Sequence, residues 1–215
     1  MKRLSILPHE YAFNAFLLLV AAREIFQSGS LLIGAAFVLL AVAGGVLVAW
    51  TQQCPQPLRW RLRLLWYPCA MGLSFYLLPL AIAALSVPRA DALLSGIDGR
   101  MLGAQAAALL LPYATPAVTD VMTLGYVFFF YYLIFGPAHY FFRDLALLRA
   151  CFAGMFVTYA LGFTGYLLWP AGGPHLAGQF ALALPHGPVS ALVLPFIDTA
   201  SNGVDVFPSI HAAIS

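Results

Sequence analysis

The sequence has very few charged residues. Lysine, arginine, aspartate and glutamate together make up 8% of its 215 residues, whereas soluble domains usually carry about 25%. Hydrophobic residues make up 62%, and the mean hydropathy is +0.89. So little charge leaves no means of covering a surface with groups that water solvates, which excludes a soluble globular domain and indicates a protein embedded in lipid. The formal net charge of +2 is also too small to indicate a nucleic-acid partner.

Cysteines and clustered carboxylates are scarce as well. The three cysteines, Cys54, Cys69 and Cys151, lie far apart in or near apolar segments, and their spacing matches no metal site. We therefore expect buried free thiols. No group of carboxylates suited to Mg²⁺ lies in the C-terminal loop, so the sequence predicts neither a metal nor an organic cofactor. A cleavable signal peptide is not indicated, because no small-x-small site follows the first apolar segment.

Long apolar segments dominate the rest of the chain. Five of them are long enough, or nearly long enough, to cross a bilayer, which takes roughly 20 residues. They are residues 11–22, 31–50, 64–87, 117–142 and 145–169. The first is the weakest and spans only if residues 7–10 join its helix. We expect a short interfacial helix at 101–111, a Gly- and Pro-rich loop at 170–206, and a sixth helix starting near Pro208. The predicted fold class is all-α: a polytopic helical membrane bundle of five full spans plus the start of a sixth.

The distribution of Lys and Arg among the loops predicts the orientation. With a cytoplasmic N-terminus, the inner segments hold seven basic residues and the outer segments three. The inner ones are Lys2, Arg3, Arg59, Arg61, Arg63, Arg143 and Arg149, and the outer ones are Arg23, Arg89 and Arg100. The same rule places the 170–206 loop on the extracytoplasmic side. We interpret the three arginines at 59, 61 and 63 as a cytoplasmic anchor that binds lipid headgroups.

Residues 205–213, Asp-Val-Phe-Pro-Ser-Ile-His-Ala-Ala, combine the residue types that phosphate chemistry needs. Pro208 is suited to the first turn of a helix, whose free N–H groups and positive dipole end attract an anion. Ser209 adds a hydroxyl donor, and His211 adds a proton that moves near neutral pH. A phosphate held beside an imidazole is a sound arrangement for phosphoryl transfer. The alternative is purely structural: His211 as a capping or interfacial histidine, and Ser209 as a first-turn serine bonded to its own backbone.

Residues 207–213 resemble the second signature motif of the type 2 phosphatidic acid phosphatase superfamily, usually written Pro-Ser-Gly-His. Ile210, in place of the Gly, is similar to the branch that contains inositol phosphorylceramide synthases and inositolphosphotransferase-like membrane proteins. Upstream, Tyr166 to Pro170 followed by Gly172-Gly173-Pro174 resembles the element that ends the preceding helix in that family. The resemblance covers roughly residues 89–215. We therefore expect N-terminal membrane helices in residues 1–88 and a partial phosphatase-like membrane core in residues 89–215.

This resemblance implies a membrane-embedded lipid phosphatase or phosphotransferase, acting through a phosphohistidine in the complete protein. It assigns His211 as the general acid toward the departing alkoxide, and Ser209 with the backbone N–H of Ile210 as phosphate ligands. Where the family's first motif supplies a Lys or Arg, this sequence has His175, a weaker and titratable cation. The third motif, with the nucleophilic His and its Asp, is absent from the 215 residues. We therefore expect a chain truncated before that motif and inactive by itself.

Several alternatives stay open at this stage. Water as acceptor would give hydrolysis of a lipid phosphate, and a lipid alcohol would give transfer of a phospho-headgroup such as phosphoinositol. A non-catalytic membrane protein or a truncated fragment is the main non-enzymatic reading, and a small transporter is disfavoured because polar residues at mid-span are sparse. Asp120 either caps a helix or lines the site. We interpret the aromatic block 128–132 as lipid-facing and core residues, in preference to a cage that encloses the substrate.

Overall fold

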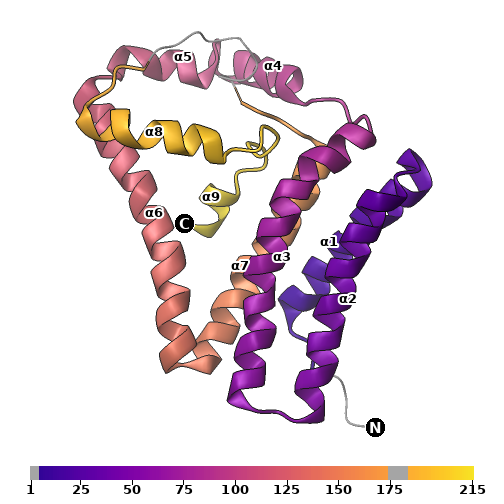
Figure 1. The fold of residues 1–215 in the computed structure, drawn as a ribbon. Coiled ribbons are helices and arrows are strands. Elements are labelled where there is room, and N and C mark those ends of the chain that lie inside the picture. The colour runs from indigo at the N-terminus through magenta and orange to yellow at the C-terminus, as the bar shows by residue number, and fades with distance from the viewer. Residues whose placement is uncertain (1–4, 174–183) are drawn as a thin grey trace.

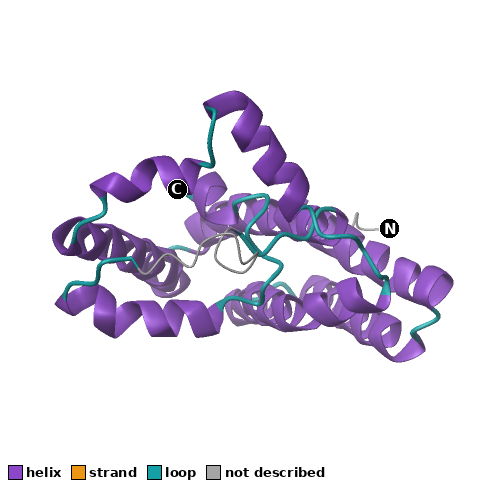
Figure 2. Ribbon diagram, turned by 90° about the horizontal axis from the view of Figure 1, so that it is seen from above, coloured by secondary structure: helices purple, strands orange, loops and turns teal. Residues whose placement is uncertain are grey.

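The computed structural model describes residues 5–173 and 184–215, and these residues form helices joined by loops, with no β-strand among them (Figures 1 and 2). Four of the helices are long and apolar enough to cross a membrane. They are α2 (Leu31–Gln53), α3 (Pro57–Ala84), α6 (Pro116–Arg143) and α7 (Leu145–Leu168). The all-α helical bundle predicted from the sequence is confirmed, and the spans expected at 31–50, 117–142 and 145–169 agree with these helices to within a few residues.

The first apolar segment forms α1 (Pro8–Arg23), which continues without a break into the π-helical turn η1 (Glu24–Ser28). The helix does include residues 8–10, but with 16 residues α1 is shorter than the four long helices. Gly29 then adopts a φ of +73°, a left-handed conformation that glycine accepts without strain, and this turns the chain into α2.

The apolar core lies where α1, α2, α3 and α7 pack together, and aromatic rings form most of its centre. Several of these rings meet edge to face at centroid distances of 5.0 to 6.3 Å, a geometry that aromatic pairs prefer. The most deeply buried include Phe13, Phe16, Phe37, Tyr67, Phe156 and Phe163. Because α7 packs against α1 and α3, this core extends across the expected boundary at residue 88.

Helix α6 leaves this core and diverges from α7, so that the two form a V with its apex at Asp144 (Figure 1). The Asp144 carboxylate caps α7 by accepting hydrogen bonds from the N–H groups of Ala146 and Leu147. Within α6 the buried side chains are Thr119 and Thr123, and most of the apolar ones are exposed. Most of the α6 surface is therefore left to lipid or to other chain segments.

Short helices lie across the end of the bundle opposite the α2–α3 turn (Figure 1). They are α4 (Asp91–Leu102), α5 (Ala106–Leu110) followed by the 3₁₀ turn η2 (Leu111–Tyr113), and α8 (Pro188–Ala200). Two expectations need correction here. The interfacial helix expected at 101–111 is interrupted at Gly103, whose φ of +75° ends α4, and the expected 170–206 loop contains the helix α8.

The last helix, α9 (Ile210–Ile214), lies inside the V, between α6 and α7 (Figure 1). A helix near Pro208 was expected, but Pro208 precedes the N-cap residue Ser209 and does not belong to the first helical turn. The cysteines also differ from expectation. All three thiols are free, yet none is fully buried, and Cys69 is exposed on the outer face of α3.

Candidate functional site

The segment 205–211 runs through the mouth of the V formed by α6 and α7, and its local structure follows from Ser209. The Ser209 Oγ accepts a hydrogen bond of 3.3 Å from the N–H of Ala212 and so caps α9. Its own hydroxyl hydrogen stays available as a donor. The capping reading of Ser209 is therefore confirmed, and capping is compatible with a second role.

Two glycines of α7 receive this segment. A Cβ atom on Gly165 would lie 2.2 Å from Cδ of Pro208, and one on Gly162 would lie 2.2 Å from Cγ1 of Ile210. Real Cβ atoms essentially never approach another heavy atom this closely, so a side chain at either position would have to displace Pro208 or Ile210. Ile210 is correspondingly buried, with 5% of its surface exposed. The two apolar residues of the motif are thus seated on the bare backbone of α7, which fixes the residues beside them.

The His211 side chain points the other way, toward α6. Its Nε2 lies 3.3 Å from the hydroxyl oxygen of Tyr126, and its ring lies 5.2 to 5.6 Å from the rings of Tyr126, Phe129 and Phe130. The imidazole is thus packed against three aromatic rings of α6, with one nitrogen bonded to a phenol, while His211 as a whole remains exposed. Such an arrangement restricts the ring orientation without closing it off from a ligand.

Tyr126 is a site residue that the sequence analysis missed, although a signal was present. Tyr126, Phe129 and Phe130 recur at i, i+3 and i+4, which places them on one face of a helix. The aromatic block 128–132 divides accordingly. Phe128, Tyr131 and Tyr132 are well exposed, whereas Phe129 and Phe130 contact His211.

A second polar cluster holds the loops behind the segment. One oxygen of Asp91 accepts hydrogen bonds of 3.0 Å from the N–H groups of both Gly172 and Gly173, and the other accepts one of 2.8 Å from Arg89. Arg89 also donates to the Gly203 carbonyl at 3.3 Å. Partial burial by itself raises the pKa of Asp91, but the hydrogen bonds from Arg89 and the two glycines outweigh it, so the pKa lies below its usual value. The ionised carboxylate thus pins the Gly172-Gly173 turn.

The same loops are joined through their backbones. The N–H of Ala90 donates to the Pro170 carbonyl at 2.8 Å, and the N–H of Val206 donates to the Ala171 carbonyl at 3.1 Å. Ala171 and Asp205 form an isolated parallel bridge, and Asp205 accepts a hydrogen bond of 2.8 Å from the Ser201 hydroxyl. The chain entering the motif at 205 is therefore aligned along the end of α7.

Asp120 is accounted for by a different contact. Its carboxylate, on α6, accepts hydrogen bonds from the N–H and the hydroxyl of Ser190 at 2.8 and 2.7 Å, and from the N–H of Val189 at 3.4 Å. It therefore caps the N-terminus of α8 from a neighbouring helix. Of the two readings of Asp120, the structure supports the helix cap, although the capped helix is one that the sequence analysis had taken as loop.

Below α9, a half-open cavity of about 310 Å³ separates α6 from α7. Its walls are Tyr132, Leu133, Gly136, Pro137 and Tyr140 of α6, Cys151, Gly154, Met155 and Thr158 of α7, and Ala213 and Ile214 of α9. The lining is mostly apolar. Because Ala213 and Ile214 follow His211 in the same short helix, the cavity lies directly beyond the imidazole, on the side toward the middle of the spans.

The remaining sequence-predicted site residue, His175, lies outside the described residues. Ser209, Ile210 and His211 lie together at the start of α9, with the Ile210 side chain turned into the core. Within residues 5–173 and 184–215, no group of three or more His, Cys, Asp or Glu side chains is arranged to hold a metal ion.

Comparison with known proteins yields one family. A model described as the PAP2 superfamily matches residues 92–215, which is more than half of the chain. The match starts in α4 and includes α6, α7, the Gly172-Gly173 turn and the 205–211 segment. Neither the curated proteins nor the solved structures contain a significant match to the chain.

Proposed function

Because the chain belongs to the PAP2 superfamily, we propose that it is part of an enzyme with phosphatase or phosphotransferase activity on a lipid phosphate, and that the start of α9 supplies the general acid and phosphate ligands of that site. The main support is the placement of His211 and Ser209 two residues apart, both exposed, in the short helix whose last residues line an apolar cavity. A phosphate beside this helix would meet the hydroxyl and the imidazole, while an acyl chain would enter the cavity. A lipid phosphate has both parts.

In this proposal His211 is the general acid that protonates the departing alkoxide. Its proton-donating nitrogen must face the ligand, and the Tyr126 hydroxyl, 3.3 Å from Nε2, fixes which way the ring is turned. The Ser209 hydroxyl and the N–H of Ile210 bind phosphate oxygens, and His175 adds a titratable positive charge. Tyr126 acts through His211 and is a positioning residue.

The finer features of the proposal follow the family branch that the motif resembles. Residues 89–215 provide the phosphatase-like core, and residues 1–88 provide the additional membrane helices. The N-terminus lies in the cytoplasm, and the site opens on the opposite side of this multi-pass membrane protein. In the complete protein the reaction passes through a phosphohistidine, formed on a histidine of the third motif that these residues do not include. Water as acceptor then gives hydrolysis, and a lipid alcohol as acceptor gives transfer of a phospho-headgroup such as phosphoinositol.

Binding of orthovanadate to the purified protein tests the site. We expect saturable binding, monitored by the quenching of intrinsic fluorescence, that becomes about 10- to 150-fold weaker in His211→Ala, as expected for a lost hydrogen bond to a charged group. His139→Ala is the matched control, because His139 is an exposed histidine of α6 whose ring contacts only the neighbouring Tyr140 within the described part of the chain. Equal binding by wild type and His211→Ala would reject the site, and a non-catalytic scaffold would then explain the chain better.

A substrate assay on the protein supplied with the third motif separates the two reaction types, whereas turnover by the 215 residues alone would contradict the expectation that they are inactive. Release of inorganic phosphate from a lipid phosphate in proteoliposomes indicates hydrolysis, and labelled phospho-headgroup recovered on a second lipid indicates transfer. Solute flux through the same proteoliposomes without either product would instead favour a transporter.

A further inference from the structure

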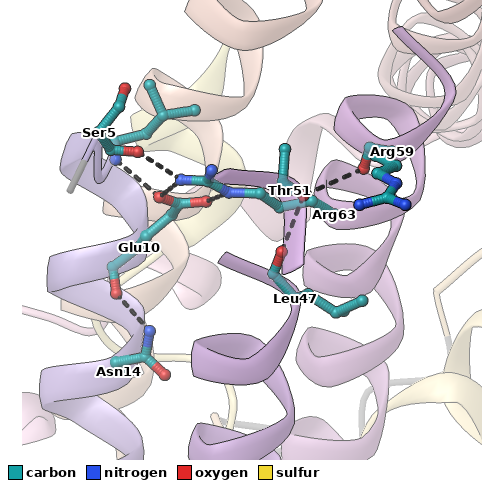
Figure 3. Close-up of polar contacts among 8 residues, drawn as sticks. Ser5, Glu10, Asn14, Leu47, Thr51, Arg59 and Arg63 are labelled. Atoms are coloured by element: carbon teal, nitrogen blue, oxygen red, sulfur yellow. Dashed lines mark hydrogen bonds and ion pairs between the residues drawn. The ribbon is translucent and has the colours of Figure 1, made fainter. Parts of the chain in front are cut away.

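The N-terminal end of α3 carries three arginines that contact three different helices. Arg59 donates to the Trp50 carbonyl of α2 at 3.1 Å, and Arg61 donates to the Phe141 carbonyl of α6 at 2.6 Å. Arg63 turns inward and forms a two-pronged hydrogen-bonded ion pair with Glu10 of α1 (Figure 3). Both side chains of this pair are fully buried. The first part of α3 is thus connected to α2, α6 and α1 by guanidinium groups.

This pattern corrects the interpretation of the three arginines as a single headgroup anchor. Arg63 is unavailable to lipid, because it is buried and its charge is neutralised by Glu10. Arg149 of α7 takes its place at the surface. Its guanidinium lies 4.1 Å from the centroid of the Trp60 ring, which also contacts the guanidinium of Arg63 at 4.3 Å.

The group Trp60, Arg61 and Arg149, here called the Trp60 corner, has an excess of positive charge. Within the described residues the ion pairs are Glu10–Arg63 and Arg89–Asp91, so neither Arg61 nor Arg149 has a carboxylate within 4 Å. Asp144, at the tip of the V, uses its carboxylate to cap α7. Arg61 has five N–H donors, and its Nε–H is the one that bonds to the Phe141 carbonyl. Both guanidinium groups are only half-buried.

Exposed apolar side chains surround these charges. Leu62 and Leu65 of α3, Phe142 of α6 and Leu147 of α7 each expose 40% or more of their surface. A small inorganic anion would use only the charges and leave this apolar surface bare. A phospholipid uses both, because its phosphate matches the guanidinium groups and its acyl chains cover the leucines.

The structure assigns the Trp60 corner as a binding site for the headgroup of an anionic phospholipid, at the end of the bundle opposite the proposed phosphate site. The corner belongs to the face that the basic residues place in the cytoplasm, where anionic lipids give the membrane surface its negative potential. Bound there, the lipid bridges α3 to the α6–α7 turn through Arg61 and Arg149. This site is independent of the proposed catalytic function.

Fluorescence of Trp60 itself tests the assignment. In a variant with Trp50, Trp66 and Trp169 changed to Phe, the protein in nanodiscs is titrated with phosphatidylglycerol or phosphatidylcholine carrying brominated chains, which quench tryptophan on contact. We expect phosphatidylglycerol, the anionic lipid, to quench Trp60 at lower concentration than phosphatidylcholine does. Arg61→Gln and Arg149→Gln should each reduce this preference about fivefold, because a basic residue near an anionic surface has about this effect.

The controls separate charge at this corner from charge in general and from misfolding. Arg100→Gln removes one positive charge from α4, at the other end of the molecule, and should leave the preference unchanged. Arg61→Lys and Arg149→Lys keep the charge and should retain the preference to within about twofold. Equal quenching by both lipids in the parent protein, or an unchanged preference in the Arg61→Gln/Arg149→Gln double variant, would overturn the assignment. Displacement by millimolar glycerol phosphate would overturn it as well, because a free phosphate would then suffice.

Discussion

Gly165→Ala should separate the stability of α7 from the geometry of the candidate site. The added methyl group would lie 2.2 Å from Cδ and 2.6 Å from Cγ of Pro208. An ordinary van der Waals contact needs at least 3.4 Å, so the two segments have to move apart by about 1.2 Å. The Pro208 ring has no rotamer through which to retreat, because it closes onto its own backbone. The movement is therefore transmitted to Ser209 and His211.

The size of the effect follows from this displacement. A misplacement of about 1 Å in a reacting geometry costs about 100-fold, so we expect Gly165→Ala to weaken orthovanadate binding by about 10- to 100-fold. The helix itself favours the change, because alanine is better than glycine in a helix interior by about 1 kcal/mol. Ligand binding should thus fall by more than the stability does, because the gain in helix propensity offsets part of the overpacking cost of about 1–3 kcal/mol.

Gly154→Ala is the matched control in the same helix. A Cβ there has no heavy atom within 4 Å outside its own helix turn and chain neighbours, so the methyl group meets no obstacle. Titration with orthovanadate and thermal unfolding, followed by circular dichroism in detergent, are measured on both variants. Wild-type binding by Gly165→Ala, or an equal loss in Gly154→Ala, would refute the argument that α7 positions the motif through this contact.

Two further predictions concern buried and interfacial charges. Glu10→Gln leaves Arg63 charged, buried and unpaired, and should lower the free energy of unfolding by about 3–5 kcal/mol, whereas Glu10→Leu combined with Arg63→Met should cost far less. Detergent-induced unfolding of the three proteins checks this, and an equally large loss in the double variant would contradict it. The pKa of Asp91 is lower in the folded protein than its usual value of 3.8. Asp91 therefore contributes its full stabilisation at pH values above 3.8, and this contribution is lost as the pH falls through the lower pKa of the folded state. The Gly172 and Gly173 amides of the wild type should therefore lose hydrogen-exchange protection on acidification. In Asp91→Asn the protection of these amides should already be reduced at neutral pH, and acidification should cause no further loss.

Much of the architecture could be predicted from the sequence alone, because lipid imposes a simple requirement. A segment that crosses a bilayer must satisfy its backbone internally and present apolar side chains, so the spans at 31–50, 117–142 and 145–169 stand out as long apolar segments. The motif around Ser209 and His211 was equally visible, since its residues are contiguous and their spacing needs no tertiary contact to be recognised.

Only the tertiary structure could decide which side chains face one another. Arg59, Arg61 and Arg63 look alike in the sequence, yet one is buried against Glu10, 53 residues earlier, and another bonds to Phe141, 80 residues later. Tyr126 reaches His211 across 85 residues. Composition and periodicity describe each helix separately, but the position of a charge or a phenol relative to another helix depends on how the helices pack. The sequence by itself thus determined that the chain is a helical membrane protein with a phosphatase-like motif, whereas packing decided which residues position that motif and which arginine is neutralised by a carboxylate.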